Sequence, residues 1–162
     1  MASKGNDALL QGLPELSAAT KIAIVKTEWN NHITDELERG ALKVIAEAGI
    51  TKVKTYAVPG AVEVPYLIRQ IDQSLTEKAD AYIAFACVIK GDTPHFDYVC
   101  QSITQGITLL NVQLQAPVIY GVLTVNNEEQ ALERIGGVHG HKGKEAAITA
   151  IKMIFLRYHV SA

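Results

Sequence analysis

Residues 81–89 are Ala81-Tyr-Ile-Ala-Phe-Ala-Cys-Val-Ile89, the longest apolar run in the chain. A run without polar alternation is typical of a strand buried on both faces of a parallel sheet. We therefore predict that these residues form the central strand of the fold. Thr93 and Pro94 follow, where they suit the cap and the first residue of a long helix that extends to about Leu114.

The rest of the chain repeats this alternation of strand and helix. Further strands are predicted at residues 21–25, 52–57 and 116–123, and further helices at residues 62–71, 128–135 and 144–158. One more helix is expected from a cap at Thr34 to a stop at Gly49. The fold class is thus α/β: a three-layer α/β/α sandwich around a four-stranded parallel sheet, flavodoxin-like, with right-handed crossovers.

Length and charge narrow the class of protein. The 162 residues suit one domain. We expect residues 1–20, which show no hydrophobic period, to form an N-terminal arm, and residues 21–162 to form the domain. Fifteen Lys and Arg against 17 Asp and Glu give a net charge of −2 without a basic stripe, which argues against a nucleic-acid partner.

Cysteine content and hydropathy indicate the compartment. Two cysteines, Cys87 and Cys100, lie in apolar runs and cannot form a disulfide framework. No signal-like segment begins the sequence, and no run approaches the 18 or so apolar residues of a membrane span. We expect a cytoplasmic protein that does not enter a membrane.

Ligands of open parallel sheets bind at the carboxyl ends of the strands. Four segments follow the predicted strands there: residues 27–30, 58–63, 90–97 and 120–124. Neither a P-loop nor a G-x-G-x-x-G motif is present, which argues against a nucleoside triphosphatase and a dinucleotide-dependent oxidoreductase.

The start of the long helix offers two chemical features. Backbone N–H groups near Asp92 and Thr93 suit an anion, although every helix has such an end and an ordinary cap is the alternative. His95, in the first turn, could relay protons near neutral pH or be a plain surface histidine.

Other polar residues near the strand ends each have two interpretations. Trp29 could anchor the core or stack on a flat heterocycle, and Glu63 could serve its own helix or bind hydroxyl groups. Arg134 and Lys142 could hold phosphate or be solvated cations. His139 and His141 have metal-like spacing, but further ligands with a recognisable spacing are missing, so no metal site is predicted.

Several ordered motifs together resemble a known family. They are Glu28-Trp-Asn30, Val58-Pro-Gly-Ala-Val-Glu-Val-Pro65, Cys87-Val-Ile-Lys-Gly-Asp-Thr-Pro-His-Phe-Asp-Tyr-Val99, Pro117-Val-Ile-Tyr-Gly-Val-Leu-Thr124, Glu129-Gln-Ala131, Arg134 and Lys142-Gly143. From Lys21 to Tyr158 the chain resembles the 6,7-dimethyl-8-ribityllumazine synthase family of riboflavin biosynthesis.

The resemblance implies an activity and its partners. The enzyme would join 5-amino-6-(D-ribitylamino)uracil to 3,4-dihydroxy-2-butanone 4-phosphate and release phosphate and water. The resemblance implies no cofactor and no metal. The expected partners are the two small-molecule substrates, further copies of the chain, and riboflavin synthase as a candidate protein partner.

The resemblance also implies residue roles. Trp29 corresponds to an aromatic that stacks on the pyrimidine, with Asn30 beside it. His95 corresponds to the proton shuttle. Further substrate-binding positions are Ala61, Val62 and Glu63 for the ribityl chain, Val88 and Ile89 near the ring, and Asp92, Thr93 and Arg134 for the phosphate. Lys90 is also expected to bind substrate. Tyr120, Arg134 and Lys142 correspond to residues that complete the pocket of a neighbouring subunit.

The chain departs from the family pattern at four positions. Trp29 replaces a usual Phe, Ala86 a common Gly, Lys90 a frequent Arg, and His141 a usual Asn. None of these changes removes a catalytic group implied by the resemblance. Because indole has the larger aromatic face, we hypothesise that Trp29 retains flavin-like products more tightly.

The assembly implied by the resemblance is a pentamer, which in some members closes into an icosahedral shell. The short segment at residues 136–143 is similar to that of shell-forming members. Pro14 argues against a shell, because an N-terminal arm that adds an edge strand to a neighbour would lose a backbone donor there. We expect a pentamer at least and leave the shell open.

Two other functions use the same scaffold, since a fold alone does not guarantee turnover. One is a non-catalytic flavin- or lumazine-binding protein, which needs a stacking aromatic but no proton shuttle. The other is a cage-forming protein, which needs the shell but no active site. His95 together with Arg134 distinguishes the enzyme from both.

Overall fold

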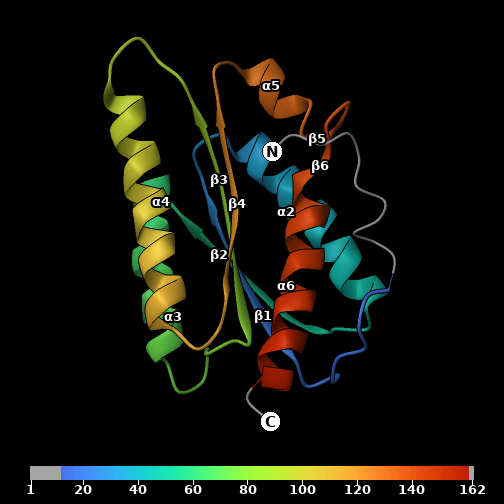
Figure 1. The fold of residues 1–162 in the computed structure, drawn as a ribbon. Coiled ribbons are helices and arrows are strands. Elements are labelled where there is room, and N and C mark those ends of the chain that lie inside the picture. Colours follow the sequence, from blue (N-terminus) through green and yellow to red (C-terminus); the bar gives the residue numbers. More distant parts are fainter. Residues whose placement is uncertain (1–11, 161–162) are drawn as a thin grey trace.

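A computed structural model describes residues 12–160 and shows three layers (Figure 1). The central sheet contains β1 (Lys21–Thr27), β2 (Lys52–Val58), β3 (Ala81–Ile89) and β4 (Val118–Val125). All four strands are parallel, in the order β2-β1-β3-β4. This confirms the predicted fold class.

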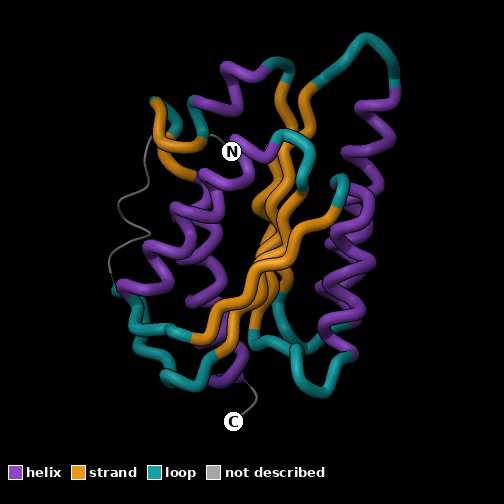
Figure 2. The backbone as a smooth tube through the Cα atoms, turned by 180° about the vertical axis from the view of Figure 1, so that it is seen from behind, coloured by secondary structure: helices purple, strands orange, loops and turns teal. Residues whose placement is uncertain are grey.

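Helices cover both faces of the sheet. Helices α3 (Val64–Gln73) and α4 (His95–Gln113) lie on one face, and α2 (Asn31–Glu47) and α6 (Lys142–Val160) lie on the other (Figures 1 and 2). Each face buries its own hydrophobic cluster against the sheet. Every strand residue of the sheet centre therefore meets a helix layer, whichever way its side chain points.

The apolar run of β3 follows from this arrangement. Ile83 and Phe85 belong to the cluster under α2 and α6, whereas Tyr82 and Ala84 belong to the cluster under α3 and α4. All four are fully buried. Because successive side chains point to opposite faces and both faces are covered, the side chains in the middle of β3 are apolar on both faces, apart from the hydrogen-bonded hydroxyl of Tyr82.

The contact between α2 and α6 depends on a very close approach of the two helices. Gly143, in the first turn of α6, lies against the backbone of Leu37 in α2. A methyl group at residue 143 would overlap the Leu37 carbonyl group, and a backbone atom cannot move aside as a side-chain tip can. Glycine is therefore required at residue 143 for the helices to pack this closely.

A hairpin at the carboxyl end of the sheet was not predicted. It consists of β5 (Ile135–Gly137) and β6 (Gly140–His141), which are antiparallel. Helix α5 (Glu128–Leu132) ends before it, so the helix predicted for residues 128–135 is too long. Gly136 and Gly140 both have positive φ angles, 126° and 76°, which glycine adopts without steric cost.

The two predicted caps are wrong. Asn30, not Thr34, occupies the N-cap position of α2, and buried Thr34 instead donates its hydroxyl to the carbonyl oxygen of Thr27 at 2.8 Å. Pro94, not Thr93, precedes the first residue of α4, and no side chain caps that helix by a hydrogen bond. The α2 cap therefore lies four residues before the predicted one, and the α4 cap one residue after it.

Only part of the expected arm can be described. Residues 1–11 lie outside the described part of the chain. Residues 12–20 contain no strand, and Leu13 and Leu16 pack against the hydrophobic cluster under α2 and α6. Within residues 12–160, no helix has the length and apolar character needed to cross a membrane.

Candidate functional site

A pocket of about 660 Å³ opens at the carboxyl ends of β1, β2 and β3. Loops after these three strands and the first turns of α4 form its wall. Its lining residues are Thr27, Trp29, Asn30, Pro59, Gly60, Ala61, Val62, Glu63, Cys87, Val88, Ile89, Gly91, Thr93, His95, Phe96 and Val99. Nine of the predicted site residues are therefore brought together: Trp29, Asn30, Ala61, Val62, Glu63, Val88, Ile89, Thr93 and His95.

Trp29 presents an exposed indole at this pocket. Its side chain is not part of the core, because the residue is 76% exposed. Its backbone is nevertheless held on both sides: its N–H donates to the Pro59 carbonyl oxygen at 3.2 Å, and its carbonyl oxygen accepts from the Thr27 hydroxyl at 2.9 Å. A large aromatic face on an anchored backbone is suited to stacking on a planar ligand.

Asn30 joins two of the pocket walls. Its backbone is left-handed, with φ 55° and ψ 42°, a conformation that Asn tolerates better than most residues. Its side-chain amide donates to the carbonyl oxygen of Cys87, at the end of β3, at 2.8 Å. The loop that carries Trp29 is thereby tied to the central strand.

His95 lies in the pocket wall at the start of α4. The imidazole is solvent-exposed, and no hydrogen bond to another described residue restrains it. The N-terminal end of this 19-residue helix, with its unpaired N–H groups, lies at the same wall. The wall therefore combines a proton-transfer group with an anion-binding helix end.

Residues 61–63 form another part of the pocket wall. They make a short 3-10 turn, η1 (Ala61–Glu63), between β2 and α3. The Glu63 carboxylate is exposed and makes no capping hydrogen bond to α3, so it is not committed to its own helix. It remains available to accept hydrogen bonds from hydroxyl groups of a ligand.

Five predicted site residues do not line this pocket. Lys90 and Asp92 are exposed on the segment between β3 and α4, beside the lining residues Ile89, Gly91 and Thr93. The other three, Tyr120, Arg134 and Lys142, lie elsewhere on the chain. One chain alone thus holds the aromatic group, the histidine and the helix end together, but not the predicted phosphate-binding cations.

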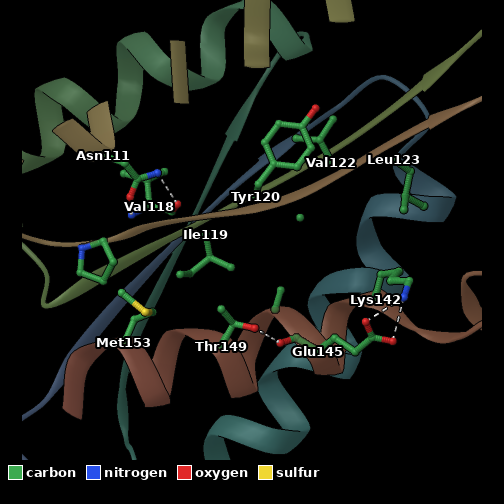
Figure 3. A pocket seen from close by; sticks show the side chains of 13 residues that line it. Asn111, Val118, Ile119, Tyr120, Val122, Leu123, Lys142, Glu145, Thr149 and Met153 are labelled. Atoms are coloured by element: carbon green, nitrogen blue, oxygen red, sulfur yellow. Dashed lines mark hydrogen bonds and ion pairs between the residues drawn. The ribbon is translucent and has the colours of Figure 1, made fainter. Parts of the chain in front are cut away.

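Tyr120 and Lys142 line a second depression, of about 440 Å³, between the edge strand β4 and helix α6 (Figure 3). The ammonium group of Lys142 donates to both carboxylate oxygens of Glu145, at 3.0 and 2.8 Å. The Tyr120 hydroxyl is hydrogen-bonded to Thr104 of α4 at 2.9 Å, on the other side of the strand. Both residues are thus displayed along an open edge of the sheet.

Arg134 lies between α5 and the hairpin. Its guanidinium donates to the Gln130 carbonyl oxygen at 2.7 Å and lies 3.7 Å from the Glu133 carboxylate. The backbone N–H of Lys142 donates to the Arg134 carbonyl oxygen at 2.8 Å, which brings the two cationic residues together across the base of the hairpin. Figure 1 places the hairpin beside α2 and α6, on the face of the sheet opposite α4.

Sequence reasoning missed several pocket residues. Phe96 and Val99 line the pocket from α4, and Val99 could have been found because it is four residues after His95, on the same helix face. Thr27 was not singled out, and nothing in its spacing reveals that its hydroxyl binds the Trp29 carbonyl.

Cys87 is not a nucleophile of this site. Burial, with a smaller contribution from the charge of Glu128, raises the pKa of its thiol to about 11. The thiol is therefore protonated at neutral pH. Among residues 12–160, no group of three or more His, Cys, Asp or Glu side chains is placed to hold a metal ion.

Comparison with known proteins gives a consistent match. Residues 19–157 match the family model of 6,7-dimethyl-8-ribityllumazine synthase. A protein of that name from Porphyromonas gingivalis is 48% identical over 135 residues, which cover 82% of this chain and 83% of the relative. Relatives with the same name from Bacteroides fragilis and Flavobacterium johnsoniae are 49% and 46% identical, over 83% and 87% of this chain and 94% and 74% of their own lengths.

The parallel sheet and the pocket at its carboxyl end define a flavodoxin-like α/β protein that binds a small molecule. With matches of this identity over most of its length, the chain belongs to the 6,7-dimethyl-8-ribityllumazine synthase family, whose members are transferases of riboflavin biosynthesis. The predicted family, enzyme class and activity are thereby confirmed.

Proposed function

We propose that the pocket at the carboxyl ends of β1, β2 and β3 is where this chain condenses 5-amino-6-(D-ribitylamino)uracil with 3,4-dihydroxy-2-butanone 4-phosphate. The observation that carries the assignment is the presence of Trp29, His95 and the N-terminal end of α4 around one pocket. The pocket thus offers an aromatic face for a planar ring, an imidazole for proton transfer and a helix N-terminus for a phosphate.

The pyrimidine substrate would stack on the exposed face of Trp29. The apolar side chains of Val88 and Ile89, at the end of β3, would line the ring, with Asn30 beside it. Lys90, the next residue after Ile89, would bind substrate from outside the pocket lining. Residues 61–63 would hold the ribityl chain, since the free Glu63 carboxylate can accept hydrogen bonds from hydroxyl groups.

His95 would serve the proton transfers. The primary amine of the pyrimidine attacks the ketone and water is lost, then phosphate leaves by β-elimination. The resulting enol is reprotonated to a second ketone, which the ribitylamino nitrogen attacks with loss of a second water as the ring closes. Each step moves a proton, and one imidazole can donate and accept in turn. Holding both substrates in one pocket supplies much of the remaining rate enhancement.

The phosphate would lie at the N-terminal end of α4, against the backbone of Asp92 and Thr93. Arg134, with Lys142 and Tyr120, would approach from a neighbouring copy of the chain. Support for this comes from their position, because all three lie outside the pocket of their own chain. Tyr120 and Lys142 line the depression along the edge strand β4, and Arg134 is joined to Lys142 by a backbone hydrogen bond. The site would then be shared between subunits of a pentamer, with closure into a shell left open.

The same proposal places the enzyme in the cytoplasm, with residues 1–20 as an arm on a domain of residues 21–162 and with riboflavin synthase as a partner that consumes the product. The non-catalytic flavin-binding and cage-forming alternatives are not favoured, because the named relatives are enzymes. A binder also has no use for a free imidazole beside an anion-binding helix end.

The direct test is to incubate the purified protein with both substrates and to follow lumazine absorbance and phosphate release together. We expect the two products in equal amounts. Tight flavin binding without either product would instead support the non-catalytic binding protein.

A further inference from the structure

The β5–β6 hairpin determines where two cationic residues lie. Arg134 directly precedes β5, and Lys142 directly follows β6. Their backbones are joined by the 2.8 Å hydrogen bond from the Lys142 N–H to the Arg134 carbonyl oxygen. Whatever holds this short hairpin against the domain therefore also fixes the origin of both side chains.

His141, the last residue of the hairpin, fastens it to helix α2. Its imidazole lies directly on the backbone of Gly40, so closely that a methyl group at residue 40 would overlap the ring. The side chain is only 11% exposed, and its Nε2 atom lies 3.3 Å from a carboxylate oxygen of Glu36. Gly40 and Glu36 are one helical turn apart, so together they form a seat for the ring.

The seat favours the neutral imidazole. Burial lowers the pKa of His141, and the charge of Lys144 on α6 lowers it further, against the opposing effect of Glu36. The Glu36 carboxylate is itself shared with Arg39. Within the described part of the chain the buried Nδ1 atom has no hydrogen-bond partner, so a proton added there would be a buried donor without an acceptor.

We propose that His141 is a positioning residue: its imidazole, seated on Gly40 and hydrogen-bonded to Glu36, holds Arg134 and Lys142 in their phosphate-binding arrangement, and protonation of the ring releases them. This rests on the proposed function, in which those cations bind the substrate phosphate. His141 touches no substrate and acts through the hairpin.

Two substitutions disrupt the contact between His141 and α2, one on each side of the contact. His141→Ala deletes the ring, and Gly40→Ala leaves the hairpin sequence intact but displaces the ring. In both we expect the KM for the phosphate-bearing substrate to rise about tenfold, with kcat within about twofold of wild type, because a loosened cation pair weakens ground-state and transition-state binding alike.

Two matched variants control for other effects. His141→Gln places an amide N–H near the position of Nε2 and has no proton to gain, so it should restore most of the affinity at neutral pH. His32→Ala removes a different histidine, which lies on α2 and pairs with the Glu128 carboxylate of α5 at 2.6 Å, but which is half-exposed and does not contact the hairpin through a hydrogen bond. We expect His32→Ala to leave the KM unchanged.

The pH dependence separates positioning from simple packing. Inorganic sulfate serves as the probe, because its charge does not change between about pH 7.5 and about pH 5.5. We expect wild-type protein to lose sulfate affinity over this interval relative to His141→Gln, in which the other titrating groups are the same. Hydrogen exchange of residues 134–142 should speed up in parallel in the wild type, beyond the intrinsic effect of pH, and not in His141→Gln.

Two outcomes overturn the proposal. One is an unchanged KM in a folded Gly40→Ala or His141→Ala enzyme, and the other is identical pH profiles of sulfate binding and hydrogen exchange in wild type and His141→Gln. Failure of the proposed function has a different signature, since wild-type protein would then form no lumazine while the hydrogen-exchange difference could still be measured.

Discussion

The side-chain amide of Asn30 donates a 2.8 Å hydrogen bond to the carbonyl oxygen of Cys87 and so joins the loop after β1 to the end of β3. Asn30→Gly keeps the left-handed backbone accessible but loses this bond, which should lower the free energy of unfolding by about 1 kcal/mol. Asn30→Ala should cost about 1 kcal/mol more, because alanine is strained in that conformation. Urea denaturation of wild type and the two variants measures the contribution of the hydrogen bond and the cost of backbone strain. Equal stabilities of the two variants would contradict the assignment of strain to this residue.

His95→Ala should slow lumazine formation by about 10²- to 10⁴-fold without abolishing it, the usual contribution of one acid–base group. Because the imidazole is exposed and unrestrained by the described residues, the thermal midpoint should stay at the wild-type value. Steady-state kinetics and thermal unfolding of the same preparation check this. A loss of folding with an unchanged rate per folded molecule would make His95 structural.

Trp29→Phe should bind riboflavin about two- to fivefold more weakly than wild type, because phenyl has a smaller face than indole for stacking. With 76% of the residue exposed, the substitution should not alter stability. Fluorescence titration with riboflavin measures the affinity. The same dissociation constant in both proteins would remove the link between Trp29 and flavin retention.

Assemblies that mix His95→Ala and Arg134→Ala subunits should be more active than either pure variant. If the pocket takes Arg134 from its neighbour, about one quarter of the pockets in a random equal mixture regain both residues in a cyclic homo-oligomer. Mass spectrometry of the intact assemblies confirms mixing. If mixed assemblies remain as inactive as the pure variants, the site does not lie between subunits.

Asp80 should stabilise the opposite end of the sheet only above acidic pH. Partial burial opposes its ionisation, but hydrogen bonds from the Lys21 N–H, Tyr158 and Arg157 outweigh burial and lower the pKa of Asp80. The folded state thus favours the carboxylate, and its contribution is lost as pH falls from the ordinary aspartate pKa toward the lower folded-state value.

The corresponding test is Asp80→Asn. At neutral pH it should lower the free energy of unfolding by about 2 kcal/mol, since several hydrogen bonds to a charged group are weakened. Denaturation at decreasing pH should show the wild type converging on the variant. If the difference in free energy of unfolding between wild type and variant did not change with pH, ionisation of Asp80 would not contribute to stability.

Much of the fold could be predicted because its main signal is local. The unbroken apolar run at residues 81–89 and the helical periodicity around it specify a parallel sheet with helices on both faces. The caps could not be predicted in the same way. Thr34 and Asn30 are both good capping residues, and the choice between them depends on Thr27 and Cys87, which are close only after folding.

The same reason separates the predictable and unpredictable parts of the site. Trp29, Glu63 and His95 lie in the segments that follow predicted strands, so the carboxyl-end rule for parallel sheets brings them together. The β5–β6 hairpin has two and three residues per strand, too few for a periodic pattern, and its position depends on the contact of His141 with Gly40. Spacing alone offers no signal for such a contact.

Glycine at residues 40 and 143 affects how sequence invariance in this family should be interpreted. At both positions selection acts on volume, since anything larger than hydrogen collides with the imidazole of His141 or with the backbone of Leu37. Purifying selection should therefore keep Gly143 as invariant as the residues that meet the substrate, and should keep Gly40 where the hairpin carries histidine at residue 141. A ranking of positions by invariance would mix helix-packing positions with the chemistry of the pocket, and only a substitution scan that reports abundance and turnover separately can tell them apart.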